Sequence, residues 1–268
     1  MSIKYKTEED IAKLREGGKI HARILKEVAK KVKPGVKSDE LNAYAEQLID
    51  EAGCTAAFLG YQPADAKRPY PASLCVSINE EIVHGIPNEG GPKSERGSGG
   101  QGKILFEGDI VTLDLGLTYQ GMITDAAITV PVGKISPKAA DLIRATKEAL
   151  DKGIAAMRVK GHVGDIGAAV MEVAVKYNLG IIEGLSGHGV GFSVHEDPFV
   201  PNRAKRGEGP ELRPGMVIAI EPMFSLGSRD IKKLPDGYTY ITRDKSLSAH
   251  FEHTVAVGYD GKIEILTK

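Results

Sequence analysis

The sequence predicts an α+β domain built from two similar halves, with any functional site between them. Each half contains two helices followed by β-strands, because the spacing of apolar residues changes from a helical period to alternation or continuous runs. The joints between the paired helices also resemble each other, since residues 32–36 read VKPGV and residues 159–163 read VKGHV. Two halves that share strands fold as one unit, so we expect a single domain over residues 1–268.

The first half begins with a helix over residues 7–32, in which Thr7 is the expected N-cap and acidic residues follow in the first turn. A second helix over residues 38–53 has Ser38 as its expected N-cap. Segments rich in branched residues then predict β-strands over residues 73–79, 104–117 and 122–132.

The second half repeats this order. Helices are predicted over residues 136–158 and 165–178. Short strands are predicted near Ile181 and over residues 217–221, 238–242, 249–257 and 262–266. Residues 88–103 are rich in Gly, Ser and charge and have no apolar periodicity, which predicts a flexible surface loop.

Composition excludes several classes of protein. The 268 residues are 41% hydrophobic, enough for a substantial core, and Lys+Arg 35 against Asp+Glu 36 leaves a net charge of −1. We therefore expect no nucleic-acid partner, which would require a clustered basic excess. No apolar run reaches about 18 residues, so no membrane span is expected. Two cysteines and no signal-peptide pattern favour reduced thiols in the cytoplasm.

Three familiar catalytic or nucleotide-binding motifs are incomplete or missing. Gly97-x-x-x-x-Gly102-Lys103 resembles a phosphate loop, but Ile104 replaces the Ser or Thr that would hold magnesium, and a strand follows instead of a helix. No G-x-S-x-G nucleophile elbow occurs. The glycines of residues 187–191 lack the spacing of a dinucleotide site.

Two aspartates in neighbouring strands indicate a metal site. Asp114 and Asp125 each lie within an otherwise apolar segment, and a four-residue turn over 118–121 places them directly opposite each other. Opposed residues of an antiparallel pair have Cβ atoms ~5 Å apart, and two carboxylates that close repel unless a proton or a cation lies between them. A single aspartate could simply cap a turn, but two in mid-strand favour a metal.

Two glutamates and a histidine extend this pattern. Glu221 follows five apolar residues, and Glu252 lies within a predicted strand, where an unpaired carboxylate is costly. Because the nearby Arg and Lys residues lie in loops, salt bridges explain these acids poorly. With His188 as a nitrogen ligand, four carboxylates and one imidazole suit a pair of divalent ions, and Mn, Fe, Co and Zn all fit.

In this order, Asp114, Asp125, His188, Glu221 and Glu252 resemble the five-ligand dinuclear site of the methionine aminopeptidase family. The surrounding sequence agrees over nearly the whole chain, in the segments SINEEIVHGIP (77–87), GHGVG (187–191), HEDP (195–198), EPM (221–223) and FEHT (251–254). The resemblance implies the pita-bread fold, in which two pseudo-symmetric halves surround a central curved antiparallel sheet. It further implies removal of N-terminal methionine before a small, uncharged second residue, by attack of metal-activated water on the first peptide bond.

The resemblance also implies a role for each site residue. Asp114 would bind one metal, Asp125 and Glu252 would bridge both, and His188 and Glu221 would complete the other. Glu221 would also handle the proton of the attacking water. His84 and His195 would contact the substrate and not the metals. The residues at methionine-pocket positions are Phe58, Tyr61, Tyr70, Cys75, Val194, Met223 and Tyr238.

Several features place the chain near the compact, bacterial type 1 members and also set it apart from them. Residues 195–221 leave no room for the helical insertion of type 2 enzymes, and the zinc-binding extension of eukaryotic type 1 forms is missing from the sequence given. Tyr238 stands where type 1 enzymes usually carry Trp, and Val194 where an aromatic residue is frequent. Residues 62–68 and 88–103 are longer than usual. Asn79 and Ser248 match a monovalent-cation site of some relatives, although a turn Asn and a strand Ser explain them equally well.

The rival interpretations are an Xaa-Pro aminopeptidase or prolidase, which shares the fold and ligands, and a binding module of the same fold that has lost its ligands. The HGIP segment at 84–87 favours methionine cleavage, and the five ligands favour an enzyme. The resemblance implies nascent polypeptide N-termini as substrate and leaves docking at the ribosome open. We expect a monomer.

Overall fold

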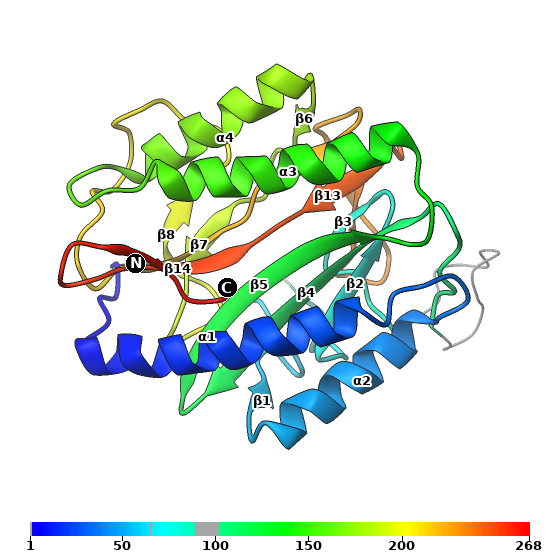
Figure 1. The fold of residues 1–268 in the computed structure, drawn as a ribbon, viewed down its shortest axis with the longest axis horizontal. Coiled ribbons are helices and arrows are strands. Elements are labelled where there is room, and N and C mark those ends of the chain that lie inside the picture. The colour runs from blue at the N-terminus through cyan, green and yellow to red at the C-terminus, as the bar shows by residue number, and fades with distance from the viewer. Residues whose placement is uncertain (1, 65, 89–101) are drawn as a thin grey trace.

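The computed structural model describes residues 2–64, 66–88 and 102–268 and shows the α+β, pita-bread architecture (Figure 1). Helices α1 (Glu8–Ala29) and α2 (Ser38–Glu51) cover one half of the sheet system, and α3 (Pro137–Ala155) and α4 (Val163–Tyr177) cover the other. Helix α1 packs against the central strands of the first half, and α3 packs against α4 and strands of the second half. The order of helices and strands predicted from periodicity is therefore confirmed.

The first half contains a four-stranded antiparallel sheet. Its central strand β4 (Ile110–Tyr119) pairs with β1 (Thr55–Ala56), β2 (Leu74–Ile78) and β5 (Met122–Pro131). The apolar side chains of α1, α2, β2 and β4 form one hydrophobic core beneath the two helices.

The second half contains several antiparallel sheets. The largest has the order β15 (Ile263–Ile265), β14 (His253–Val257), β9 (Val217–Ile220), β7 (Gly187–Gly189) and β8 (Glu196–Val200). Another joins β13 (Ser248–His250), β10 (Met223–Ser225) and β6 (Gly180–Ile181). A third joins β11 (Ile231–Lys233) and β12 (Tyr240–Thr242) to β3 (Glu81–Val83) of the first half. Because β3 and β12 pair, strands from the two halves belong to one sheet.

Thr7 caps α1 as predicted, since its hydroxyl accepts the Asp10 N–H and the Asp10 carboxylate accepts the Thr7 N–H. The prediction for Ser38 is wrong, because the N-cap of α2 is Lys37, without a side-chain hydrogen bond. The Ser38 hydroxyl instead donates to the Pro87 carbonyl and accepts the Lys103 N–H, each at 2.7 Å. Ser38 thus holds both segments that flank residues 89–101. Residues 89–101 make up most of the loop predicted over 88–103, and they lie outside the described residues.

The hairpin that carries the two aspartates differs from the prediction in its register. Its turn has two central residues, Gln120 and Gly121, both with positive φ (48° and 78°), instead of four. Asp114 therefore pairs with Ala127 and Asp125 with Gly116, so the two aspartates lie diagonally on one face of the sheet and not directly opposite each other. An even shift in register preserves the face, which is why both still point into the same site.

The predicted strand over residues 249–257 is interrupted. Strand β13 ends at His250 and β14 begins at His253, and each belongs to a different sheet. Glu252 lies at this break, where its backbone N–H donates to the Ala127 carbonyl of β5 at 2.9 Å. The break allows one continuous segment to serve two sheets and to turn Glu252 toward the first half.

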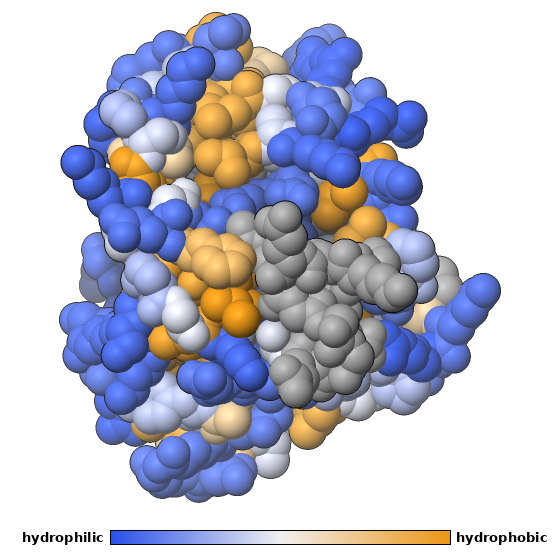
Figure 2. All heavy atoms as spheres, turned by 90° about the vertical axis from the view of Figure 1, so that its right-hand side faces the viewer, coloured by the Kyte–Doolittle hydropathy of each residue, from blue (hydrophilic) through white to orange (hydrophobic). Residues whose placement is uncertain are grey.

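The face at the right of Figure 1 is mostly hydrophilic, and its hydrophobic side chains gather in separate patches (Figure 2). In the part of the chain that the structure describes, no helix is long and apolar enough to cross a membrane.

Candidate metal centre and substrate pocket

The five predicted ligands converge from both halves of the fold. Asp114 and Asp125 lie on β4 and β5, and His188 lies on β7. Glu221 lies between β9 and β10, and Glu252 between β13 and β14. All four carboxylates are buried, from 9% exposure at Glu221 to 2% at Glu252.

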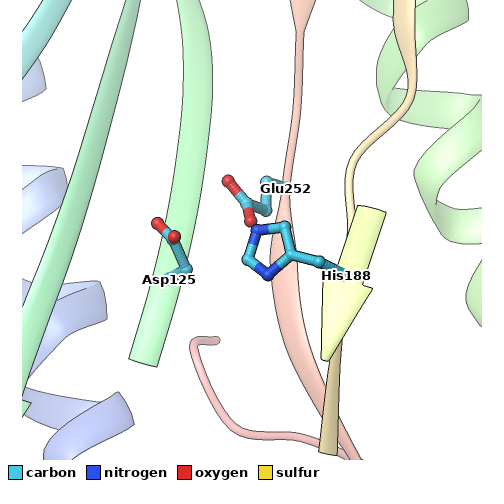
Figure 3. A group of neighbouring side chains, drawn as sticks. All are labelled: Asp125, His188 and Glu252. Atoms are coloured by element: carbon cyan, nitrogen blue, oxygen red, sulfur yellow. The ribbon is translucent and has the colours of Figure 1, made fainter. Parts of the chain in front are cut away.

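Asp125, His188 and Glu252 form the first compact group. One potential ligand atom from each lies within 4.8 Å of the others, and Figure 3 shows the three side chains meeting from separate segments. His188 Nδ1 lies 2.9 Å from the carbonyl oxygen of Gly189, to which the protonated nitrogen donates. This leaves Nε2 for a ligand, and Nε2 lies 3.4 Å from Glu221 Oε1.

A second compact group contains a residue that the sequence pattern did not single out. Glu221, His250 and Glu252 also offer three ligand atoms within 4.8 Å of one another. Glu252 belongs to both groups, as expected of a carboxylate shared by two ions. The available signal was the spacing of two residues between His250 and Glu252, which places side chains on one face of a strand. Asp114 lies outside both groups, so its role as a ligand stays a prediction.

The carboxylates lack the partners that would make them purely structural. Asp114 Oδ1, Asp125 Oδ1 and Glu252 Oε1 are buried without a hydrogen bond. Across residues 2–64, 66–88 and 102–268, the ion-pair contacts found for these acids involve only histidines. Buried oxygens of this kind, together with imidazole nitrogen, fit divalent transition metals.

The pKa values of the site agree with this interpretation. Burial raises the pKa of Asp114 to about 7, and burial together with the charge of Asp114 raises that of Asp125 well above its usual value. Burial and neighbouring aspartates also raise the pKa values of Glu221 and Glu252. Burial lowers the pKa of His188 to about 3, so its ring is neutral and has a lone pair to donate.

Two threonines on different strands, Thr254 of β14 and Thr129 of β5, hold the backbone of the site. The Thr254 hydroxyl accepts the Asp125 N–H at 2.8 Å and donates to the Asp125 carbonyl at 2.7 Å. The Thr129 hydroxyl does the same for His250, accepting its N–H at 2.9 Å and donating to its carbonyl at 2.8 Å. These paired bonds fix the positions from which both side chains enter the site.

The metal-free protein is expected to lose stability as the pH rises above 6.5. The four carboxyl groups have folded pKa values above their unfolded ones, so the folded state binds more protons than the unfolded state. This stability is complete below the unfolded values near 4 and is lost as the pH rises through the folded values, about 7 for Asp114. The buried histidines oppose the trend only below their usual value of 6.5.

Urea unfolding of chelator-treated protein over a pH series measures this slope. Excess Mn²⁺ should flatten or reverse it, since cations then replace protons between the carboxylates. A metal-free stability that is constant or rising above pH 6.5 would show that these carboxyl groups are not held protonated.

All fourteen residues predicted for the site line one pocket with a volume of about 210 Å³. The pocket joins the carboxylate cluster to an apolar side formed by Phe58, Tyr70, Cys75, Val194 and Tyr238, which pack as one buried cluster. A charged end and an apolar end in one pocket can hold the amino terminus of a chain and its first side chain together.

The two predicted substrate histidines lie beside the cluster. The Tyr61 hydroxyl lies 2.9 Å from His195 Nδ1, which leaves His195 Nε2 for another partner. The His195 ring stands edge-on to that of His188, with centroids 4.4 Å apart. His84 follows β3 with φ 59°, and burial lowers its pKa to about 4.

Tyr238 connects the pocket to the 62–68 segment. Its hydroxyl donates to the Arg68 carbonyl, and its ring meets that of Tyr70 edge-on at 5.1 Å. Pro63 and Ala66 line the pocket as well. The described residues of the 62–68 segment, which exclude position 65, thus form part of the pocket wall.

Asn79 and Ser248 are adjacent, since the Ser248 N–H donates to the Asn79 carbonyl at 2.9 Å. The Asn79 amide donates to Asp109 at 2.8 Å and accepts the Ile110 N–H at 3.0 Å, as expected of a turn residue. These contacts explain Asn79 without a cation, and the monovalent site stays a prediction.

The chain is similar to known proteins over its full length. The model of metallopeptidase family M24 matches residues 12–258. A methionine aminopeptidase from Aquifex aeolicus is 45% identical over all of both chains, and one from Bacillus subtilis is 37% identical over 98% of each. The crystal structure of methionine aminopeptidase from Thermotoga maritima superposes with a TM-score of 0.90 at 37% identity, covering all of both chains.

A prolidase from Pyrococcus horikoshii shares the fold at a TM-score of 0.72 and 22% identity, and the match covers 98% of this chain but 63% of the prolidase. The full-length similarity therefore favours the methionine aminopeptidases over the prolidases. The chain belongs to metallopeptidase family M24 and, within it, to the methionine aminopeptidases.

Proposed function

We propose that this protein removes the N-terminal methionine from nascent proteins and peptides, with preference for a small, uncharged second residue. The observation that carries the proposal is a single pocket that joins five metal-ligand candidates, two histidines and an apolar lining. The similarity to methionine aminopeptidases over the whole chain supports it.

We infer two divalent ions, with Glu252 common to both, because the two compact groups share that residue. This division differs from the expected one, in which Asp125 also bridges both ions and His188 shares an ion with Glu221. In the compact groups, Asp125 and His188 would complete one and Glu221 the other, and Asp114 would add a further carboxylate. When bound, such ions act as Lewis acids and activate water at neutral pH. Oxygen-rich groups with imidazole accept Mn, Fe, Co or Zn, so availability in the cell selects the ion.

The protein's own residues bind and orient the peptide. The apolar lining formed by Cys75, Tyr70 and Met223 suits a flexible thioether. His195, oriented by Tyr61, can donate a hydrogen bond to the peptide or to the developing oxyanion, and His84 enters the pocket from β3. Glu221 lies on the pocket wall, where it can take the proton of the attacking water.

We place the active protein in the cytoplasm as a monomeric type 1 enzyme whose single catalytic domain spans residues 1–268 and which acts on nascent chains. The sheet shared by β3 and β12 supports one domain. Docking at the ribosome is a separate proposal, which ribosome co-sedimentation would test.

A peptide panel tests the substrate assignment after chelation and add-back of metal. Met-Ala-Ser should be cleaved, whereas Ala-Pro peptides and formylated Met-Ala-Ser should not. Norleucine should be cleaved about 10–200-fold more slowly than methionine, the usual effect of a small change in an apolar pocket. Preference for Xaa-Pro bonds, or equal cleavage before alanine and before leucine, would favour the prolidase group instead.

A further inference from the structure

His250 is buried at the edge of the metal centre, and its side chain makes no hydrogen bond. It is 1% exposed, and among the residues that the structure describes, neither ring nitrogen has a hydrogen-bond partner. Buried imidazoles normally have such partners, as His21 has with Thr124 and His253 with Thr267. His21 retains one buried nitrogen without a partner, Nε2, whereas both ring nitrogens of His250 lack one.

The surroundings of His250 are acidic. Its Nε2 lies 3.5 Å from Glu221 Oε2 and 3.8 Å from Glu252 Oε2. Both distances exceed those of hydrogen bonds. They are close to the separation of two donors on one tetrahedral cation, which is ~3.4 Å when each donor lies ~2.1 Å from the ion.

The arrangement around Glu221 is nearly symmetric. His188 Nε2 lies 3.4 Å from one carboxylate oxygen of Glu221, and His250 Nε2 lies 3.5 Å from the other. His250 therefore lies as close to a Glu221 oxygen as the predicted ligand His188 does.

The position of His250 is fixed before any ion binds. Thr129 holds both its N–H and its carbonyl, and β13 pairs His250 with Met223 of β10. A rigid backbone that presents an unpartnered nitrogen to two carboxylates is the geometry of a prepared ligand.

We propose that His250 supplies a second imidazole to the metal centre, binding through Nε2 the ion held by Glu221 and Glu252. The inference rests on the metal centre of the proposed function. The ion with His250 then has nitrogen and oxygen ligands, which favours Zn, Fe or Co over Mn at that position.

Nitrogen NMR of the imidazoles during Zn²⁺ titration of the metal-free protein tests the assignment. With ¹⁵N-labelled histidine, the Nε2 resonances of His188 and His250 should both move on zinc binding. One should be missing in His188→Gln and the other in His250→Gln. His21→Gln serves as control for the loss of a buried imidazole outside the site, and it should keep both metal-sensitive resonances.

Affinity alone would not separate a ligand from a residue that orients a ligand, since either loss weakens binding by at least about 10–100-fold. The resonance does separate them, because only direct coordination changes the bonding of Nε2. His250→Gln should also weaken Zn²⁺ binding by a larger factor than Mn²⁺ binding, measured by calorimetry.

Zinc binding that leaves the His250 resonance unchanged would overturn the inference and leave the proposed function standing. No zinc binding by the folded wild-type protein would overturn both. If His250→Gln does not fold, His250→Asn provides the same assignment, and the wild-type spectrum still shows whether two imidazole nitrogens or only one respond to zinc.

Discussion

Asp125→Ala is expected to abolish metal binding and turnover together. Asp125 is buried, belongs to the compact group with His188 and Glu252, and has one oxygen without a hydrogen bond. Its removal eliminates one of the three ligand candidates of that group. Metal content by plasma emission, measured beside hydrolysis of Met-Ala-Ser, provides the test.

The same substitution should not unfold the protein. Burial raises the pKa of Asp125 well above its usual value, so at neutral pH the metal-free protein must protonate this group on folding, and its removal relieves that cost. The metal-free variant should therefore be at least as stable at neutral pH as metal-free wild type, and Asp125→Asn should behave alike. Retained metal with normal activity in either variant would refute the ligand role of Asp125.

His195→Ala is expected to keep its metals and to lose roughly 10²–10⁴-fold in rate, the usual contribution of a positioned acid, base or oxyanion donor. His84→Ala should behave in the same way. His188→Ala should instead lose metal affinity, because its Nε2 faces the carboxylate cluster. Metal analysis and kinetics on the three variants distinguish substrate contacts from ligands.

Tyr61→Phe is the matched control for His195, since it removes only the hydroxyl at 2.9 Å from Nδ1. It should reduce the rate less than His195→Ala does and leave metal content unchanged. A metal-free His195→Ala protein would reverse the division of roles between the histidines.

The ligand types were predictable from the sequence because a carboxylate inside an apolar strand segment is stable only beside a cation, a proton or a hydrogen-bond donor. Their geometry was less predictable. The hairpin turn has two central residues and not four, which moved Asp114 and Asp125 from opposed to diagonal positions. That error was harmless only because a shift of two residues keeps a side chain on the same face.

Tertiary pairing defines the elements that sequence patterns missed. Strand β7 is the three-residue segment GHG, and β8 contains a proline, so their partners in the sheet and not their sequence patterns define them. The break at Glu252 arises because β13 and β14, which flank it, pair in two different sheets. The spacing of His250 and Glu252 was a weak signal, and the lack of hydrogen-bond partners that singles out His250 is seen in the structure.

The placement of ligand candidates in both halves has a consequence for the stability of the fold. An ion held by both Asp125 and Glu252 would join residues that are separated by about half of the chain and that only the folded state brings together. Cys54 and Cys75 are free thiols, so no disulfide between them provides that constraint. A bound cation thus acts as a reversible cross-link between the halves, and at 100 times its dissociation constant it adds about 2.7 kcal/mol to the free energy of unfolding. Loss of the bound metal would therefore make this protein easier to proteolyse and would also remove its activity.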